Sequence, residues 1–200
     1  MKAWIFSLFC LLSLSACSFL PRSQEPAAQT YRLAPVVTPA PTGWVARKVL
    51  YVPEIEVNPA LDSERITLVK DGLQQDFIAH SRWPDKLSRY LHASLVESLS
   101  QSGQFQAVLT QFVGKNQPFK LLMRVAHFEV AYPSPAQMPP AAAVDVQCEV
   151  TLIRAADQQV IQQKQYHVRR EHIPLSTSQA VNALNAAWGE IITQIATDIR

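Results

Sequence analysis

Glycine and charged residues are scarce in this chain, and each shortage excludes a class of function. There are 5 glycines among 200 residues, and none forms a phosphate-binding loop, a dinucleotide fingerprint or the Gly-x-Ser-x-Gly turn of a serine hydrolase. The net charge is +2, and the 18 Lys and Arg residues form no dense cluster. The sequence therefore predicts no nucleotide cofactor and no nucleic-acid partner.

Cysteine and histidine are too few and too dispersed for a metal site. The chain has 3 cysteines, of which only Cys148 lies outside the N-terminal region, so an intrachain disulfide is not expected in the folded part. Among the 5 histidines, only His167 and His172 lie close together. Because a zinc site requires more ligands nearby, we expect no metal and no cofactor.

The remaining candidates for catalysis also have simpler interpretations. Asp145 and Glu149 share one face of a predicted strand and could mimic a pair of catalytic carboxylates. A solvated strand face explains them more simply. Cys148 lies on the apolar side of the same strand, where a buried thiol is inert. We therefore expect no catalytic residues and no enzymatic activity, and a lipoprotein hydrolase acting on envelope polymers is the disfavoured alternative.

The N-terminus has the layout of a secretory signal peptide. Lys2 supplies a positive charge, an apolar run extends from Trp4 to Leu14, and the small pair Ser15-Ala16 precedes Cys17. The run is shorter than the roughly 20 residues that a transmembrane helix needs. A cysteine directly after the small pair resembles a bacterial lipobox. That resemblance implies removal of residues 1–16 and acylation of Cys17, including palmitate at the new amino terminus.

The resemblance to a lipobox also indicates the compartment. In Gram-negative lipoproteins, an Asp after the cysteine is typical of retention at the inner membrane, whereas this chain has Ser18. We therefore expect a lipid anchor on the periplasmic face of the outer membrane. Two or three acyl chains hold a protein firmly, because one chain alone binds only marginally.

Proline marks the segment that follows the anchor. Five prolines lie between Ser18 and Pro41, which predicts an extended linker over residues 17–42 and a single folded domain over residues 43–200. Tyr31 and Leu33 interrupt this composition and are candidates for a short docked edge strand.

Hydrophobic periodicity predicts an α+β domain. Strands are expected at Lys48 to Val52 and Arg65 to Val69, with an Asp-Gly turn leading to a return strand. A helix with an apolar stripe is expected from Pro84, at its first position, to Ser102-Gly103. A short strand at Phe105 to Phe112 follows it.

The second half of the chain predicts three long strands and a terminal helix. The strands are expected at Phe119 to Val130, Val144 to Leu152 and Gln159 to Arg169, with a Pro/Ala-rich loop at residues 133–143. Strict alternation in the second of these strands is typical of an antiparallel strand with one buried face. The final helix begins near Ser176 and carries Trp188 on its apolar stripe. The expected fold is an antiparallel sheet with two main helices on one face.

Several segments together resemble the ABC-type transport auxiliary lipoprotein family, whose members accompany MCE-type lipid transporters, including the paraquat-inducible system. In chain order these segments are Tyr31-Arg32-Leu33, Arg65 to Leu68 before an Asp-Gly turn, Ser81-Arg82-Trp83-Pro84, Ser102 to Val108, Leu121 to Val125, Phe128-Glu129 and Ala180 to Trp188. Each segment alone is weakly specific, and their order and spacing behind a lipobox carry the resemblance.

The resemblance implies a function in binding. Such a protein would be a periplasmic accessory subunit whose partners are an MCE-domain protein and its ABC permease and ATPase. It would contribute to phospholipid trafficking between membranes and to envelope integrity. A ring-forming partner also implies self-association as a homo-oligomer. An assembly lipoprotein, such as a pilotin or an outer-membrane complex scaffold, is the alternative that the anchor, linker and domain would serve equally.

Overall fold

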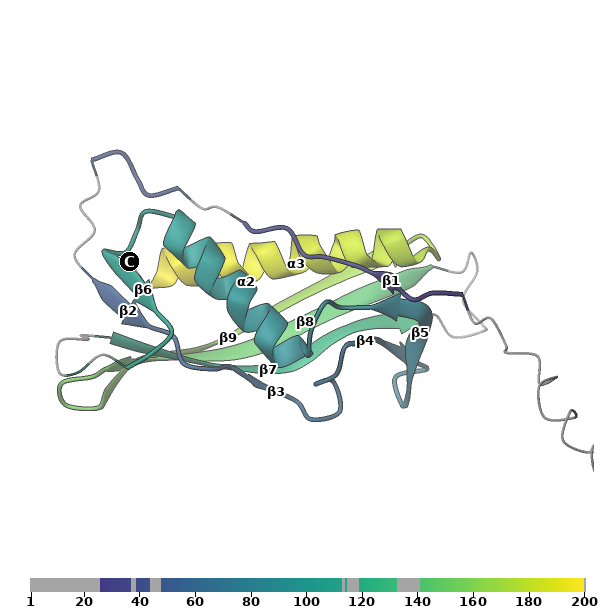
Figure 1. The fold of residues 1–200 in the computed structure, drawn as a ribbon, viewed down its shortest axis with the longest axis horizontal. Coiled ribbons are helices and arrows are strands. Elements are labelled where there is room, and N and C mark those ends of the chain that lie inside the picture. Colours follow the sequence, from purple (N-terminus) through teal and green to yellow (C-terminus); the bar gives the residue numbers. More distant parts are fainter. Residues whose placement is uncertain are drawn as a thin grey trace, which may run out of the picture.

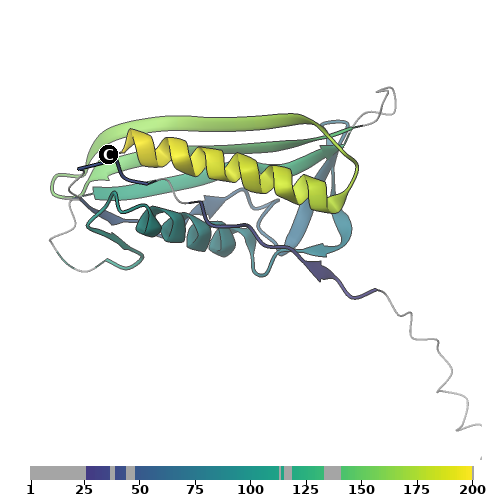
Figure 2. The same cartoon turned by 90° about the horizontal axis from the view of Figure 1, so that it is seen from above.

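The protein is an elongated sheet with two helices packed on one of its faces (Figure 1). The structure, a computed structural model, describes residues 26–36, 39–43, 48–112, 114, 119–132 and 141–199. Helices α2 (Leu87–Gln101) and α3 (Thr177–Asp198) lie over the same side of the sheet, as the view from above also shows (Figure 2). The predicted α+β class is confirmed. Among the described residues, neither helix has the length and hydropathy needed to cross a bilayer.

Three long antiparallel strands form the main part of the sheet. They are β7 (Phe119–Tyr132), β8 (Ala142–Arg154) and β9 (Gln159–Ile173). The alternation predicted for the middle strand is present, because its apolar side chains at positions 144, 146, 148, 150 and 152 are all buried under the helices. The Pro/Ala-rich loop predicted at residues 133–143 lies mostly outside the described residues, and Ala142 already belongs to β8.

The other edge of β7 is built from short strands, and here the pairing is parallel. Strands β2 (Val49–Tyr51), β3 (Glu56–Val57) and β4 (Arg65–Lys70) each run parallel to β7. Strand β5 (Gln74–Arg82) returns antiparallel to β4, and β6 (Ala107–Leu109) lies parallel to β2. The sheet is therefore mixed, whereas an antiparallel sheet was expected, because β5 and α2 together carry the chain back to the start of β7. A helical crossover of this kind permits parallel pairing.

Helix α2 begins later than the sequence indicates, because its N-terminal cap comes from a distant loop. The periodicity places the start at Pro84, whereas the helix begins at Leu87. The Leu87 N–H donates to the carbonyl of Ser63 at 3.2 Å, and the Ser88 N–H donates to Asp62 Oδ1 at 2.9 Å. These contacts satisfy N–H groups that a helix start leaves without intrahelical partners.

A column of aromatic side chains joins the sheet to both helices. Phe128, which lies on β7, has ring centroids 5.9 Å from Trp83 and 6.1 Å from Trp188, both in edge-to-face geometry. Both tryptophans are 1% exposed. The indole N–H of Trp188 donates to Ser94 Oγ of α2 at 3.1 Å, so the one polar atom of this side chain has a partner.

Residues 29–36, which precede the predicted domain, pack against it over the helices (Figure 1). We call residues 29–36 the strap. It begins with β1 (Gln29–Thr30), which pairs in parallel with β5, and continues to Leu33, whose side chain is buried in the core. The docked edge strand is thus present, displaced to β1 just before Tyr31. The predicted linker, residues 17–42, accordingly contains a docked stretch in its second half.

Side chains of both helices bind the backbone of the strap. The Leu33 N–H donates to the Tyr90 hydroxyl at 2.6 Å, which ties the strap to α2. The next residue, Ala34, donates its N–H to Asn185 Oδ1 of α3 at 2.8 Å. Two residues later, the Val36 N–H donates to a serine hydroxyl of α2. Because these acceptors belong to two helices, the strap crosses the line along which the helices meet.

A glycine in α3 leaves room for the strap. A Cβ built on Gly189 would lie 2.5 Å from Cγ2 of Val36, which is closer than carbon atoms approach without displacement. Glycine inside a helix costs about 1 kcal/mol relative to alanine. The close approach of the strap gives a physical reason for glycine at this position.

Replacing Trp188 with Ala is expected to lower the free energy of unfolding by about 3–5 kcal/mol, because the side chain is buried and its removal leaves a cavity between sheet and helices. Urea denaturation followed by circular dichroism measures the change. Asn182→Ala, on the exposed side of the same helix, is the control and should change stability by less than about 0.5 kcal/mol. Equal effects of both substitutions would contradict the packing described.

Replacing Gly189 with Ala is expected to displace the strap while leaving the sheet and helices folded, because the new methyl group occupies the position of the Val36 side chain. Limited trypsin digestion should then cleave faster after Arg32. The double variant Gly189→Ala with Val36→Ala should recover protection, since it removes the clashing carbon. A single variant that is cleaved at the wild-type rate would show that the strap does not need this close approach.

Candidate functional site

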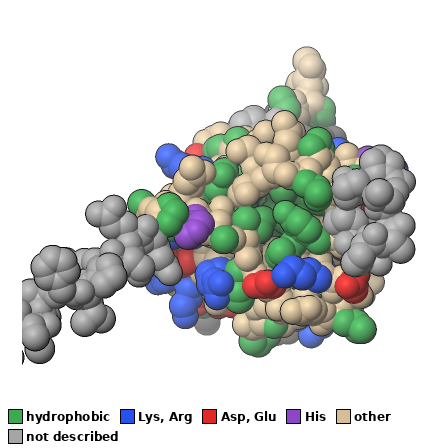
Figure 3. All heavy atoms as spheres, turned by 90° about the vertical axis from the view of Figure 1, so that its right-hand side faces the viewer, with side chains coloured by type: hydrophobic (Ala, Val, Ile, Leu, Met, Phe, Trp, Pro, Cys, Tyr) green, Lys and Arg blue, Asp and Glu red, His purple; other side chains and the backbone are tan. Residues whose placement is uncertain are grey.

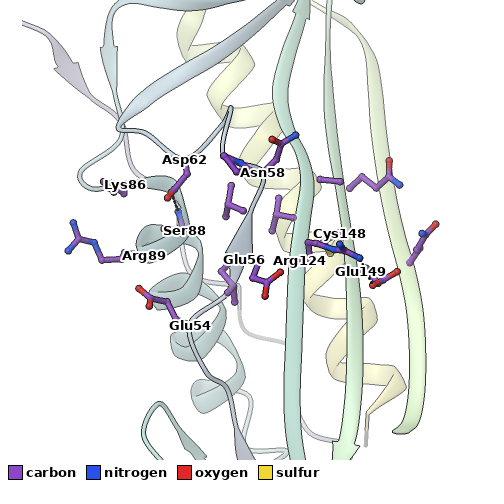
Figure 4. Close-up of a pocket in the computed structure, with 17 residues that line it drawn as sticks. Glu54, Glu56, Asn58, Asp62, Lys86, Ser88, Arg89, Arg124, Cys148 and Glu149 are labelled. Atoms are coloured by element: carbon purple, nitrogen blue, oxygen red, sulfur yellow. Dashed lines mark hydrogen bonds and ion pairs between the residues drawn. The ribbon is translucent and has the colours of Figure 1, made fainter.

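The structure forms a cleft where the edge of the sheet is thinnest. Strand β3 is 2 residues long and bridges the interval along β7 between β2 and β4. The cleft has a volume of about 970 Å³ and lies between β3, the N-terminal end of α2, and the middle of β7 and β8 (Figure 4). It arises because so short a strand leaves the sheet edge locally narrow.

Acidic and basic side chains line the cleft in nearly balanced numbers. The acidic ones are Glu54, Glu56, Asp62 and Glu149, and the basic ones are Lys86, Arg89 and Arg124. Arg124 contacts Glu149 at 3.2 Å, and Arg89 contacts Asp85 at 2.7 Å. In Figure 4, the two acidic side chains of the β3 segment lie between the basic side chains near α2 and the ion pair of β7 and β8. A surface with both signs of charge suits a polar, charged partner.

The thiol at the back of the cleft is chemically quiet. Cys148 is 1% exposed, and burial raises the pKa of its thiol to about 12. A thiol with that pKa stays protonated at neutral pH and is not a nucleophile. This agrees with the interpretation of Cys148 as a core residue. Among the residues that the structure describes, no group of three or more His, Cys, Asp or Glu side chains could hold a metal ion.

The face of the sheet opposite the helices carries a row of ion pairs. Asp145 contacts His167 at 2.9 Å and Arg169 at 3.1 Å, and Glu149 contacts Arg124. The two carboxylates that could have formed a catalytic pair are therefore each engaged by a cation on a neighbouring strand. Partly exposed pairs of this kind contribute little to stability, but they fix the pattern of charge that a partner would meet.

The charged residues at the end of β9, from Arg169 to His172, make two kinds of contact. Arg169 interacts with Asp145 and Glu171 on the open face, and hydrogen bonds to these carboxylates raise the pKa of its guanidinium. Arg170 points the other way and contacts Glu190 of α3 at 2.9 Å, so it ties the edge strand to the helix. His172 has a φ of 62° at an irregularity of the β8–β9 register and joins no metal-binding group.

Of the other residues singled out by sequence, some lie in the core and one lies outside the described residues. Trp188 is buried, which confirms its predicted place on the apolar stripe of the final helix, and Trp83 is buried as well. Cys17, the predicted site of lipidation, lies outside the described residues. The cleft was not anticipated from sequence. The signal that could have revealed it is the alternation Glu54-Ile55-Glu56-Val57 between two prolines, which is typical of a short strand with one buried side.

The fold is similar to those of proteins with known crystal structures. A DUF330 protein of Xanthomonas campestris has a crystal structure similar to this chain, with a TM-score of 0.70 and 23% identity over 84% of this chain and 92% of that chain. A second crystal structure, of an uncharacterized protein, has a TM-score of 0.67 and 21% identity over 87% of this chain and 99% of the other. No curated protein matches the chain by sequence.

The family comparison covers almost the whole of the folded region. The model of the ABC-type transport auxiliary lipoprotein component matches residues 31–196, from the strap to the last turns of α3. That range includes the cleft, the open sheet face and the aromatic column. The chain therefore belongs to the ABC-type transport auxiliary lipoprotein family.

Proposed function

We propose that this protein is a lipid-anchored accessory subunit of an MCE-type ABC lipid transport system, held at the periplasmic face of the outer membrane. Its work is to bind partner subunits, an MCE-domain protein with its permease and ATPase. Through them it contributes to phospholipid trafficking between the two membranes and to envelope integrity.

The observation that carries this proposal is the family match placed directly behind a lipobox-like sequence. The family is an auxiliary lipoprotein component of ABC-type transport, and the match begins at residue 31, shortly after Cys17. Lipidation of Cys17 supplies the anchor that the family description requires. The serine that follows this cysteine supports the outer rather than the inner membrane.

Binding, rather than catalysis, is supported by the state of the polar groups. In the cleft the only thiol has a raised pKa, and Arg124 neutralises Glu149. On the open face Asp145 contacts Arg169 at 3.1 Å and His167 at 2.9 Å. Such groups are arranged to recognise a charged surface, and ion pairs of this kind give specificity and steering more than raw affinity.

Replacing Cys17 with Ser is expected to release the protein from the membrane fraction while the domain stays folded, because the contacts that hold the described core together involve residues from Gln29 onward. Mass spectrometry of the wild-type protein should detect an acylated Cys17 with residues 1–16 removed. The melting temperature of the soluble variant should equal that of the wild-type domain. An unmodified Cys17, or a wild-type protein found in the soluble fraction, would contradict the anchoring.

Crosslinking in intact envelopes, with the anchored protein as bait, is expected to capture MCE and permease subunits. A charge-reversal variant, Arg124→Glu, should reduce the capture, since it places like charges at the mouth of the cleft. Arg89→Glu, at the other side of the same cleft, tests whether the whole cleft takes part. Repeated recovery of secretin or pilus components without any MCE protein would favour the alternative, an assembly lipoprotein. A deletion strain should also become sensitive to detergents.

A further inference from the structure

Several chain reversals meet at one end of the sheet. Register pairs Lys70 of β4 with Tyr132 of β7, and Ala142 of β8 with Ile173 of β9. The β4–β5 turn therefore lies at the same end as the turn between β9 and α3. We call this the hairpin end. Figure 3 looks onto it and shows hydrophobic side chains over its middle and charged side chains toward its lower edge.

The most exposed large apolar side chain in the described structure lies at this hairpin end. Leu73 follows the Asp71-Gly72 turn and is 95% exposed. The turn is fixed, because both Asp71 and Gly72 have positive φ and the Leu73 N–H donates to the Lys70 carbonyl at 3.1 Å. A second exposed leucine, Leu175, lies in the β9–α3 turn and is 47% exposed. Leu73 thus projects from a hydrogen-bonded turn and is almost fully exposed among the residues that the structure describes.

The N-terminal segment leaves the domain toward the same end. Gln29 pairs with Ser81 and Thr30 with Arg82, in parallel with β5. Because β5 runs from the turn at Leu73 toward Arg82, residues that precede Gln29 head back toward that turn. In Figure 1 the described residues just ahead of β1 lie on this side of the molecule. The point where the tether joins the domain and the leucine tip therefore belong to one end of the domain.

The tether between them is short compared with the domain. Residues 17–28 can span about 40 Å when fully extended. Strand β9 alone has 15 residues and extends for about 50 Å. Because the strap is docked from Gln29 onward, it adds nothing to this reach. A tether of this length, attached at the hairpin end, favours that end over the opposite one as the part of the domain that faces the bilayer.

We propose that the hairpin end docks on the phospholipid surface in which the chain is anchored, with Leu73 inserted among the headgroups. The inference rests on the lipid anchor at Cys17 in the proposed function, and it adds an orientation: the opposite end, with the β8–β9 turn, points into the periplasm.

A membrane is the occupant that the geometry favours. One leucine is a weak contact by itself, but a tether turns docking into an intramolecular event at high effective concentration. The charges beside the tip do not oppose insertion strongly, because Lys70 contacts Asp76 at 2.7 Å and the Asp71 carboxylate of the turn can stay at the level of the headgroups. The contact should therefore be mainly apolar and only weakly sensitive to salt.

A fluorescent probe at the tip tests the orientation in the full, lipidated protein. Purified protein is reconstituted into vesicles of phosphatidylethanolamine and phosphatidylglycerol. Leu73→Cys is labelled with the environment-sensitive dye NBD, and Ala156→Cys, in the exposed β8–β9 turn, is the matched control. Labelling is selective, because Cys148 is buried and its thiol has a raised pKa. Circular dichroism confirms that each variant is folded.

We expect the probe at position 73 to shift to the blue in vesicles and to be quenched by doxyl-labelled lipid. The probe at position 156 should stay quenchable by aqueous iodide. Vesicle-bound protein whose position-73 probe stays in water, or whose two probes respond alike, would overturn the docking and leave the anchor intact. A shift that appears without lipid as protein concentration rises would assign the tip to a second copy instead. Protein that fails to float with the vesicles would overturn the anchor and, with it, this inference.

Discussion

The contact on which the rest of the structure depends is the edge-to-face column of Trp83, Phe128 and Trp188. It is the point where the middle of β7 meets the segment leading into α2 on one side and α3 on the other. Large aromatic side chains contribute more buried area than any aliphatic residue, and their edges and faces attract one another. The hydrogen bond from Trp188 to Ser94 makes this packing directional, because the indole N–H must meet one hydroxyl of α2. This packing positions both helices over the sheet. The backbone N–H groups of the strap then donate to side chains on the outer side of the helices.

The strap follows from that arrangement and decides how the domain is presented. Its backbone donates to Tyr90 of α2 and Asn185 of α3, so the segment can dock only when the two helices stand correctly side by side. Docking from Gln29 onward directs the described start of the chain toward the end that carries Leu73. If the proposed anchor at Cys17 is present, this docking couples its position to the fold, whereas an undocked linker over residues 17–42 would not.

The surfaces available to partners are polar, and ion pairs between neighbouring strands fix the positions of their charged side chains. The cleft beside β3 and the open face of β7–β9 share Arg124 and Glu149, so they form one continuous charged region rather than two separate sites. A chain with net charge +2 recognises a partner through such local patterns, since its overall field is weak. The proposed membrane contact at the hairpin end and the proposed protein contact along this charged region would engage different parts of the molecule, so both could form at once.

The sequence by itself determined the elements whose signal is local. Strict alternation identified β8, the Asp71-Gly72 pair identified the hairpin, and the apolar stripe through Trp188 identified α3. Each of these patterns depends only on residues that are close together in the sequence. The burial of Cys148 also followed from its face of that strand, whereas the sequence predicted only a solvated face for Asp145 and the structure added its contacts with His167 and Arg169. Tertiary structure alone decided the parallel pairing of β2, β3 and β4, since pairing partners lie far apart in the chain. It also decided the start of α2, where Asp62 caps the helix from 26 residues away. The cleft and the docked strap were also decided by the tertiary structure, because each forms only when segments distant in sequence come together.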